Sequence, residues 1–296
     1  MPVYSISDIA KITGGSLRKE SDSRVREIVI DSRKIFSPAE SVFIAIPGDR
    51  HDGHDYIEDL WGKGVRNYII SRSAIDFSRF PGCNFIQIPS TLGALQQIAA
   101  HHRNSFNFPV VGITGSNGKT IVKEWIYHLL DDLYSVVRSP KSYNSQIGVP
   151  LSVWEMHPEY NFGVFEAGIS KPGEMQRLQN IIQPDIGLFT NIGSAHQENF
   201  KSLKQKIQEK LQLFQEAETI IYCKDHEEID REIRNDDVLS RKQLVNWSED
   251  YKADLVIDTI QKKNGYTEIT GYYRDQYDTI TIPFIDRGSI ENAIHV

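Results

Sequence analysis

The segment 110–120 constrains the fold of this chain more than any other. It reads Val-Val-Gly-Ile-Thr-Gly-Ser-Asn-Gly-Lys-Thr, a short apolar strand and a glycine-rich loop that ends in Lys-Thr, and an amphipathic helix follows. The N–H groups of such a loop can surround a polyphosphate, and the N-terminus of the following helix favours negative charge. We therefore predict a nucleotide phosphate site, in which Lys119 reaches the terminal phosphates and Thr120 holds Mg2+. The residues expected to bind the nucleotide are Gly115, Ser116, Asn117, Gly118, Lys119 and Thr120.

The glycine spacing in this loop departs from the common phosphate-loop pattern. That pattern places a glycine five residues before the glycine of Gly-Lys-Thr, and Ile113 stands there. The glycines fall instead at positions 112, 115 and 118. The alternative is a strand-to-helix turn that contains a lysine and binds nothing. Because strand, loop, Lys-Thr and helix follow one another in the order that phosphate binding requires, we favour a variant phosphate site.

Composition restricts the partners of the chain. Its 296 residues, of which 40% are hydrophobic and 25% charged, are typical of a soluble globular protein large enough for two domains. The net charge of -7 argues against a nucleic-acid partner. Cys83 and Cys223 lack metal-ligand spacing and are expected to be reduced thiols. The sequence has no signal pattern and no apolar run of membrane-spanning length, so we expect a cytoplasmic protein with no membrane partner.

The order of the predicted elements indicates an α/β fold with two domains. Residues 1–107 alternate between short strands and helices, and Pro109 marks the boundary because it interrupts a helix pattern over 92–106. Residues 108–296 then repeat strand, loop and helix, which is typical of a mostly parallel sheet with helices on both faces. After Trp247 three strand patterns follow, and we expect them to be antiparallel at the sheet edge. The prediction is a small N-terminal α/β domain followed by a central domain similar to a P-loop ATPase.

Two predicted strand ends carry side chains suited to a metal site. Ligands of open α/β sheets bind beyond the carboxyl ends of the strands. The strand predicted at 162–167 places Glu166 where the phosphate loop also opens, and a carboxylate suits Mg2+. The strand predicted at 185–190 runs into a loop with His196, whose imidazole can bind a second metal or donate a hydrogen bond. The alternatives are a solvated or helix-capping glutamate and a histidine of the polar surface.

The helix predicted at 202–217 carries a lysine on its apolar face. At about 100° per residue, Lys210 falls near the centre of an apolar stripe, and Lys204 and Lys206 fall toward its edges. Burial lowers the pKa of a lysine, and the neutral amine can react with CO2 to give a carbamate that binds metal. Alternatively, Lys210 extends outward and keeps its ammonium in water. The stripe consists of Leu203, Ile207, Leu211 and Phe214.

These residues, in this order, resemble the Mur ligases of bacterial cell-wall synthesis, and most closely the MurF type, the UDP-N-acetylmuramoyl-tripeptide:D-alanyl-D-alanine ligases. The resemblance covers nearly the whole chain. The segment 112–120 is similar to the ATP loop of that family, which accounts for the unusual glycine spacing. The family's carbamylated lysine falls fourteen residues after a metal-loop histidine, as Lys210 does after His196. The other similar segments are 31–33, 42–48, 52–54, 143–150, 166–168 and 191–196.

The resemblance implies an ATP-dependent amide ligation. The terminal carboxylate of UDP-N-acetylmuramoyl-tripeptide attacks the γ-phosphate of ATP to give an acyl phosphate, and the amine of D-alanyl-D-alanine then displaces phosphate. Because two anions meet, the site must neutralise charge. The expected catalytic residues are Lys119, His196 and Lys210. The expected ligands of two Mg2+ ions are Thr120, Glu166, His196 and carbamylated Lys210. The residues expected to bind the UDP-muramoyl peptide are Asp31, Ser32, Arg33, Asn144 and Ser145.

The C-terminal segment departs from the family pattern. Asn292 matches a residue of the adenine-contacting segment and is expected to bind the nucleotide, but Gly288 and Ser289 stand where histidine and asparagine are usual. Asn199 and Lys201 likewise replace glycines of the family. These variants are similar to the Bacteroidetes branch, in which a MurF-type portion is fused ahead of an alanine racemase.

Mur ligases have a third, C-terminal domain that closes over ATP and binds the incoming amino acid or dipeptide. The sequence stops at Val296, before such a domain, so we expect a fragment that binds UDP-muramoyl peptide and ATP but ligates poorly or not at all. Two other interpretations stay open. A folylpolyglutamate-synthase-like ligase shares the ATP core, but residues 1–107 argue against it because that family lacks a UDP-binding domain. A non-catalytic module that binds a UDP-sugar or a nucleotide fits a polypeptide that naturally ends at Val296.

Overall fold

The computed structural model describes all residues except 1–2, 49–50, 194–196, 251 and 275. The chain divides into two compact units. The first unit comprises residues 1–106 and 153–158, and the second comprises 107–152 and 159–296. Both cysteines are buried free thiols, as predicted. No helix in the described part of the chain has the length and apolar character needed to cross a membrane.

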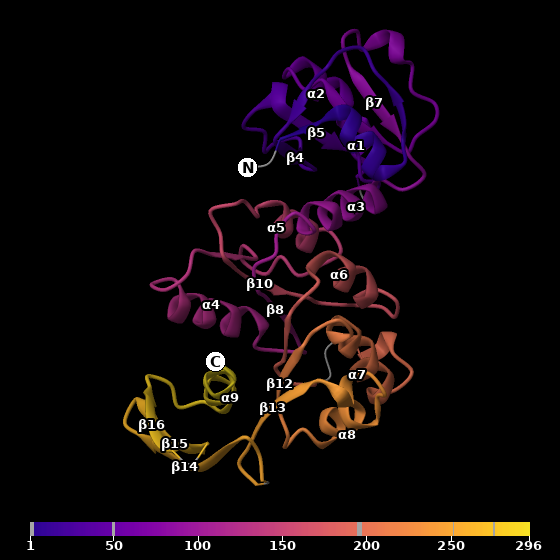
Figure 1. The fold of residues 1–296 in the computed structure, drawn as a ribbon. Coiled ribbons are helices and arrows are strands. Elements are labelled where there is room, and N and C mark those ends of the chain that lie inside the picture. The colour runs from indigo at the N-terminus through magenta and orange to yellow at the C-terminus, as the bar shows by residue number, and fades with distance from the viewer. Residues whose placement is uncertain (1–2, 49–50, 194–196, 251, 275) are drawn as a thin grey trace. The chain divides into compact units, whose positions relative to one another are not determined.

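A five-stranded sheet forms the centre of the first unit (Figure 1). The strand order is β2-β7-β6-β5-β4, in which β2 is antiparallel to its neighbour and the other pairs are parallel. Two short strands, β1 and β3, form a separate antiparallel pair. The elements are β1 (Tyr4–Ser5), α1 (Ile6–Thr13), β2 (Ser16–Arg18), β3 (Arg24–Val25), β4 (Glu27–Val29), β5 (Ser41–Ile44), α2 (Ile57–Gly62), β6 (Asn67–Ile70), β7 (Asn84–Gln87) and α3 (Thr91–Arg103).

The interior of this sheet combines aromatic packing with one polar pair. Every residue of β5 and β6 is buried, which is typical of parallel strands covered on both faces. Tyr68 stacks on Phe85 with 5.2 Å between ring centroids. Asn67 and Asn84 are register partners, and Asn84 Nδ2 donates to Asn67 Oδ1 at 2.8 Å. Because a slip of one residue would leave these buried amides unpaired, they fix the alignment of β6 with β7.

The second unit contains a nine-stranded sheet with the order β16-β15-β14-β13-β12-β11-β8-β10-β9. The pairs from β9 to β14 are parallel, and β14, β15 and β16 are antiparallel at one edge. The predicted mostly parallel sheet with an antiparallel edge is therefore confirmed. The strands are β8 (Val110–Thr114), β9 (Val136–Arg138), β10 (Phe162–Glu166), β11 (Ile186–Phe189), β12 (Thr219–Cys223), β13 (Gln243–Ser248), β14 (Leu255–Lys263), β15 (Tyr266–Tyr273) and β16 (Gln276–Ile282).

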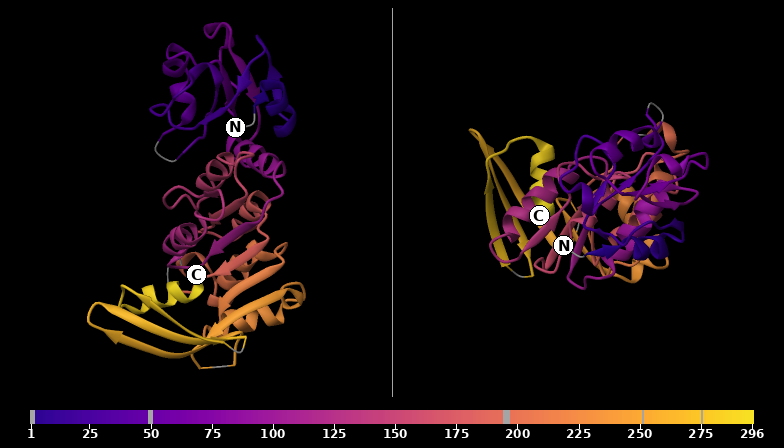
Figure 2. Two further views of the ribbon diagram at one scale, coloured as in Figure 1. Left: turned by 60° about the vertical axis from the view of Figure 1, so that its left-hand side comes forward. Right: turned by 90° about the horizontal axis from the view of Figure 1, so that it is seen from above.

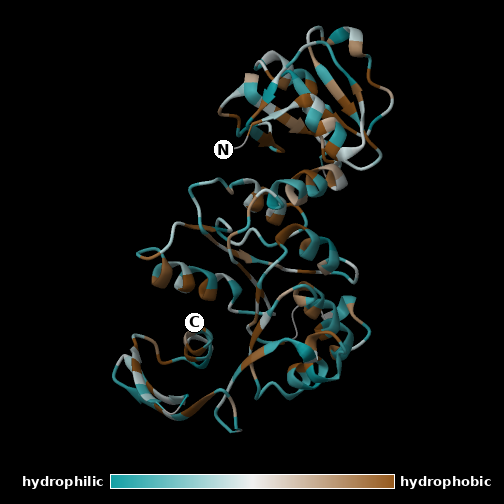
Figure 3. Ribbon diagram, in the orientation of Figure 1, coloured by the Kyte–Doolittle hydropathy of each residue, from teal (hydrophilic) through white to brown (hydrophobic). Residues whose placement is uncertain are grey.

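Helices cover both faces of this sheet. Figures 1 and 2 show α4 and α9 on one face, and α6, α7 and α8 on the other. Gly112 and Gly187 allow close packing on the second face, because a Cβ atom on them would meet Pro184 and Phe214. The central strands are mostly hydrophobic, whereas α7 and α8 are mostly hydrophilic (Figure 3). The helices are α4 (Lys119–Leu130), α5 (Gly148–Trp154), α6 (Met175–Ile182), α7 (Leu203–Leu211), α8 (Glu227–Asn235) and α9 (Arg287–His295).

The direction of strand addition reverses at β8. Strands β10 and β9 lie on one side of β8, and β11, β12 and β13 lie on the other. In open parallel sheets such a reversal leaves a crevice beyond the carboxyl ends of the strands, where ligands bind. The loops that follow β8, β10 and β11 meet at this place, which is where the sequence predicts the phosphate site.

Candidate functional site

The loop after β8 needs glycine at two positions. Gly115 and Gly118 have φ angles of 144° and 82°, which favour glycine over residues with a side chain. Both positions are also crowded. A Cβ atom on Gly115 would collide with Thr190 Oγ1, and one on Gly118 would collide with Asn292 Oδ1. The backbone conformation of this loop therefore requires the glycines at 115 and 118, whose spacing departs from the common phosphate-loop pattern.

The loop after β11 braces the phosphate loop. Ser116 N donates to Asn191 O at 2.9 Å, and Asn117 N donates to Asn191 Oδ1 at 3.0 Å. In the other direction, Thr190 Oγ1 donates to Asn117 O at 2.6 Å, and Gly193 N donates to Ser116 Oγ at 2.9 Å. Two of the amides expected to surround a polyphosphate are thus bonded within the protein. The N-terminus of α4, whose first N–H groups have no acceptor inside the helix, is the part of the loop best placed to bind an anion.

Three lysine side chains converge on these loops. Lys119 Nζ donates to Gly115 O at 2.9 Å, and Lys210 Nζ donates to the same oxygen at 3.0 Å. Lys206, one turn before Lys210 on α7, donates to Gly193 O. Lys206 is 1% exposed and Lys210 is 4% exposed, so both side chains point into the protein. The alternative in which Lys210 extends into water is therefore wrong, and Lys206 is as deeply buried although it was expected toward the edge of the stripe.

The surroundings of these lysines lower their pKa values. The pKa of Lys210 falls to about 7, first because of burial and then because of the charges of Lys119 and Lys206. Burial also lowers the pKa of Lys119 and of Lys206, and nearby carboxylates oppose both shifts. A lysine whose pKa lies near neutrality has a large fraction of neutral amine, which is its nucleophilic form. Lys210 thus has the chemistry that carbamylation requires.

Glu166 lies at the end of β10, beside the first turn of α4. Its side chain is fully buried, and Thr120 Oγ1 donates to its Oε2 atom at 2.9 Å. A hydroxyl and a carboxylate oxygen in contact form a donor set that fits Mg2+. Within the described ranges, no three His, Cys, Asp or Glu residues cluster into a metal site. His196, the predicted histidine ligand, lies outside the described residues.

A cavity of about 150 Å³ opens beside these groups. The phosphate loop, the loop before α5 and the loop after β10 form its walls. Two lysines predicted to be catalytic, Lys119 and Lys210, and two predicted substrate-binding residues therefore line one space. The lining residues are Gly115, Ser116, Lys119, Asn144, Ser145, Gly168, Ile169, Ser170 and Lys210.

The other predicted substrate residues, Asp31, Ser32 and Arg33, belong to the first unit. Arg33 forms a bidentate pair with Asp31, with Nε–Oδ1 and Nη2–Oδ2 distances of 2.8 Å each. Hydrogen bonds from Arg33 lower the pKa of Asp31 to about 2. Because the Arg33 side chain is 85% exposed, its remaining N–H donors are open to an anionic ligand such as a phosphate.

Helix α9 brings Asn292 to the phosphate loop. Asn292 is 5% exposed and fills the space beside Gly118. His295 anchors the end of the helix. Trp247 Nε1 donates to His295 Nδ1 at 3.2 Å, so Nε2 carries the proton and donates to Thr190 O at 2.7 Å. Thr190, which follows β11 and braces the phosphate loop, is thus also bonded to α9.

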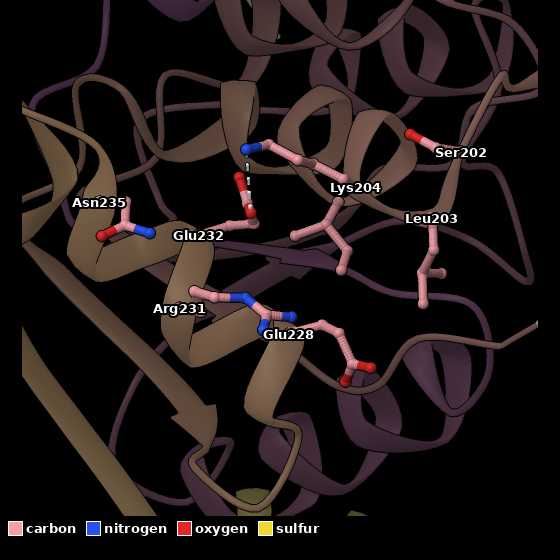
Figure 4. Close-up of a pocket in the computed structure, with 8 residues that line it drawn as sticks. Ser202, Leu203, Lys204, Glu228, Arg231, Glu232 and Asn235 are labelled. Atoms are coloured by element: carbon pink, nitrogen blue, oxygen red, sulfur yellow. Dashed lines mark ion pairs between the residues drawn. The ribbon is translucent and has the colours of Figure 1, made fainter.

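A larger hollow, of about 410 Å³, lies between α7 and α8 (Figure 4). Its charged side chains interact with one another: Lys204 Nζ lies 3.6 Å from Glu232 Oε1. Glu228 and Arg231 of α8 also line it. Since both signs of charge are mixed there and its walls come from these two helices, we assign the functional site to the smaller cavity at the phosphate loop.

Two models of known protein families match this sequence. The model of the Mur ligase middle domain matches residues 113–296, and a second model, of the Mur ligase family catalytic domain, matches residues 24–103. The chain belongs to the Mur ligase family. The Mur ligase middle domain therefore contains the phosphate loop, Glu166, Lys210 and α9.

Two similar proteins from different bacteria have the same name. The UDP-N-acetylmuramoyl-tripeptide–D-alanyl-D-alanine ligase of Buchnera aphidicola (strain APS) is 36% identical over 71% of this chain and 44% of its own length. The ligase of the same name from Bacillus subtilis is 31% identical over 75% of this chain and 49% of its own length. This Mur ligase chain thus spans about half the length of the curated relatives it matches.

Solved structures agree with the fold. MurF from Acinetobacter baumannii superposes with a TM-score of 0.87 at 22% identity, over 99% of this chain and 63% of its own. MurF from Thermotoga maritima, solved in complex with ADP, superposes with a TM-score of 0.80 at 25% identity, over 92% of this chain and 61% of its own.

Sequence reasoning missed several residues of the Mur ligase site. Lys123 and Lys206 are buried within it, and each lies four residues from a predicted site lysine. That spacing places both on the same helix face as Lys119 or Lys210 and was an available signal. The bracing role of Thr190 and Asn191 had no local signal, since both act on the loop across more than 70 residues.

Proposed function

We propose that the chain is the UDP-muramoyl-peptide- and ATP-binding part of a MurF-type ligase, which joins D-alanyl-D-alanine to UDP-N-acetylmuramoyl-tripeptide. The observation that carries the proposal is the cavity in which Lys119 and Lys210 meet Asn144 and Ser145. The names of the relatives support the same reaction. In this proposal residues 1–107 bind the UDP-sugar part and residues 108–296 bind ATP. Because the reaction consumes ATP, we place it in the cytoplasm.

The proposed role of the chain is to bring two anions together and neutralise them. Lys119 and the N-terminus of α4 bind the β- and γ-phosphates. Asn144 and Ser145 orient the muramoyl-peptide carboxylate toward the γ-phosphate. The carboxylate oxygen forms a bond to phosphorus while the bond to the ADP oxygen breaks, which gives an acyl phosphate. The amine of D-alanyl-D-alanine then forms the amide and releases phosphate.

Thr120 and Glu166 fit one Mg2+ ion through their adjacent oxygens. When bound, Mg2+ neutralises charge on the phosphate oxygens. Lys210 has a lowered pKa and a buried position, and both favour reaction of its neutral amine with CO2. The reaction releases one proton and leaves a carbamate anion, which with His196 is the proposed holder of a second Mg2+. Asn292 is the proposed contact of α9 with the nucleotide.

Calorimetry on the chain tests substrate recognition. We expect UDP-N-acetylmuramoyl-tripeptide to bind more tightly than UDP-N-acetylglucosamine, because Asn144 and Ser145 are proposed to contact the peptide, which UDP-N-acetylglucosamine lacks. Equal affinities contradict a muramoyl-peptide site. Ligation itself is tested with a polypeptide extended to the length of the curated relatives, supplied with the tripeptide precursor, D-alanyl-D-alanine and ATP.

Two other functions have specific discriminating results. A mutant of L. casei folylpolyglutamate synthase superposes with a TM-score of 0.53 at 12% identity over 67% of this chain, so it shares the fold of one part only. Growth of a glutamate chain on folate by the extended polypeptide would favour that function. Tight binding of the UDP-sugar with no ATP-dependent amide formation would favour a non-catalytic binding module.

A further inference from the structure

Lys123 is a fully buried lysine one helical turn after Lys119 on α4. Its side chain is 0% exposed. An ammonium removed from water is unfavourable unless it is paired and hydrogen-bonded. The partners of Lys123 therefore indicate why a lysine stands at this position.

Two kinds of partner surround the Lys123 ammonium. It donates to the carbonyl oxygen of Ser139 at 2.7 Å and to that of Lys141. It also lies 3.1 Å from Glu124 Oε1 and 3.6 Å from Glu166 Oε1. One cation thus joins the turn after β9 to the carboxylate at the end of β10.

The two oxygens of Glu166 share one partner and differ in the others. Thr120 Oγ1 donates to Oε2 at 2.9 Å and more weakly to Oε1 at 3.3 Å. Lys123 Nζ pairs with Oε1, whereas Asn144 Nδ2 lies 3.5 Å from Oε2. Asn144 lines the cavity. The Lys123 ammonium therefore pairs with Oε1 and leaves Oε2 next to Asn144, a residue of the cavity wall.

The turn that Lys123 holds leads directly to the substrate-binding residues. Lys141 has a φ of 51°, which residues with a side chain rarely adopt, so the turn needs support from its surroundings. Glu166 N donates to Ser139 Oγ at 3.2 Å, and Gly168 N donates to Asn144 O at 2.8 Å. Hydrogen bonds thus connect the turn after β9 to the end of β10, next to Lys123. The connected segment includes Asn144.

We propose that Lys123 is a positioning residue that couples the phosphate and metal side of the cavity to the muramoyl-peptide side. Its ammonium orients Glu166 with Oε2 toward the cavity, and its bonds to Ser139 and Lys141 hold the turn that presents Asn144. This inference rests on the proposed function. One substitution at Lys123 should therefore weaken the binding of two different ligands.

The test compares Lys123→Met with the wild-type chain by calorimetry. ATP affinity is measured with Mg2+ and with EDTA, and UDP-N-acetylmuramoyl-tripeptide affinity is measured separately. The gain in ATP affinity that Mg2+ gives should fall roughly tenfold or more, the usual effect of removing a group that orients a metal ligand. Tripeptide affinity should fall in the same variant, while ATP affinity in EDTA changes by no more than about twofold.

Glu124→Gln is the matched control. It removes the other carboxylate paired with Lys123, which also pairs with Arg138, and leaves Glu166 untouched. Both affinities should stay within about twofold of wild type. If Glu124→Gln reproduces the losses, or if Lys123→Met affects only one ligand or neither, the coupling is overturned.

A second pair of variants keeps the test valid if Lys123→Met does not fold. Glu166→Gln removes the buried charge that Lys123 balances, so Lys123→Met is introduced into that background. Tripeptide affinity should be lower in the double variant than in Glu166→Gln alone, because the turn has lost its support. Equal affinities overturn the inference. A wild-type chain that binds neither ATP nor the tripeptide overturns the proposed function, and this inference with it.

Discussion

Lys119 and Lys210 donate to one carbonyl oxygen, that of Gly115, at N···O distances of 2.9 and 3.0 Å. Two ammonium groups that share an acceptor repel each other, and the charge of Lys119 contributes to the lowered pKa of Lys210. Conversion of Lys210 to a carbamate replaces this repulsion by attraction. The arrangement therefore favours the modification that the proposed function requires.

Replacement of Lys210 should abolish ligation. We expect no ligase activity from Lys210→Ala in a polypeptide extended to the length of the relatives, and partial recovery when short carboxylic acids are added, because they replace the carbamate oxygens. The measurement is ATP-dependent phosphate release. Lys204→Ala is the control, since its side chain is 65% exposed on the same helix. A Lys210→Ala enzyme that is active and saturates normally with Mg2+ contradicts the carbamate role.

Replacement of Lys119 should weaken nucleotide binding. The ammonium is placed to form charge-assisted hydrogen bonds to phosphate, so Lys119→Met should lower ATP affinity roughly tenfold or more. Calorimetry of the chain with ATP and Mg2+ measures the effect, and Lys204→Met should bind as the wild type does. Unchanged ATP affinity in Lys119→Met would exclude the loop as the phosphate site.

Substitution of Gly118 should show two separable costs. Its φ of 82° is unfavourable for alanine by about 1–2 kcal/mol, and the added Cβ also collides with Asn292. Gly118→Ala should therefore destabilise the second unit more than Gly265→Ala, where φ is 85° and the surrounding space is open. Denaturant unfolding measures both. Asn292→Gly should restore part of the loss in Gly118→Ala, and strictly additive effects would show that the two residues do not interact.

Acid should destabilise the first unit through His102. Burial lowers the pKa of this histidine to about 4, from an ordinary value of 6.5. As pH falls below 6.5, His102 takes up a proton in the unfolded chain but not in the folded chain. The contribution of neutral His102 to the free energy of unfolding is therefore complete above that pH and is lost toward pH 4. Between pH 7 and pH 5 the loss should be about 2 kcal/mol.

Urea unfolding of the wild type and of His102→Gln at both pH values tests this expectation. The variant should lose less stability on acidification, whatever its stability at pH 7. The same pH dependence in both proteins would assign the effect to other groups.

Most strands and helices could be predicted because one periodic pattern dominates each of them. The parallel strands β8, β10, β11 and β12 are short apolar runs, and the three antiparallel strands follow Trp247 as expected. Helix α8 and strand β13 were not predicted. In α8 only Ile229 and Ile233 are buried apolar residues, so just two positions in a short, highly charged segment carry the helical pattern.

The site was predictable where its chemistry is local. The phosphate loop carries its glycines, lysine and threonine in one segment, whereas Asn191 contacts that loop from 74 residues away. Periodicity placed Lys210 on an inward face, but it could not show that Gly115 lies opposite. For Lys123 the sequence gives only the helix face, and the pairing with Glu166 depends on how β10 aligns with β8.

The bond from His295 to Thr190 spans 105 residues of sequence. On a ribosome that adds roughly 5–20 residues per second, Thr190 is made about 5–20 s before its partner His295 is made. During that interval the central strands can pair, but α9 is not yet present to bring Asn292 beside the loop. The nucleotide site is therefore among the last parts of this unit to mature during translation, and a nascent chain stalled before α9 should carry an unfinished one.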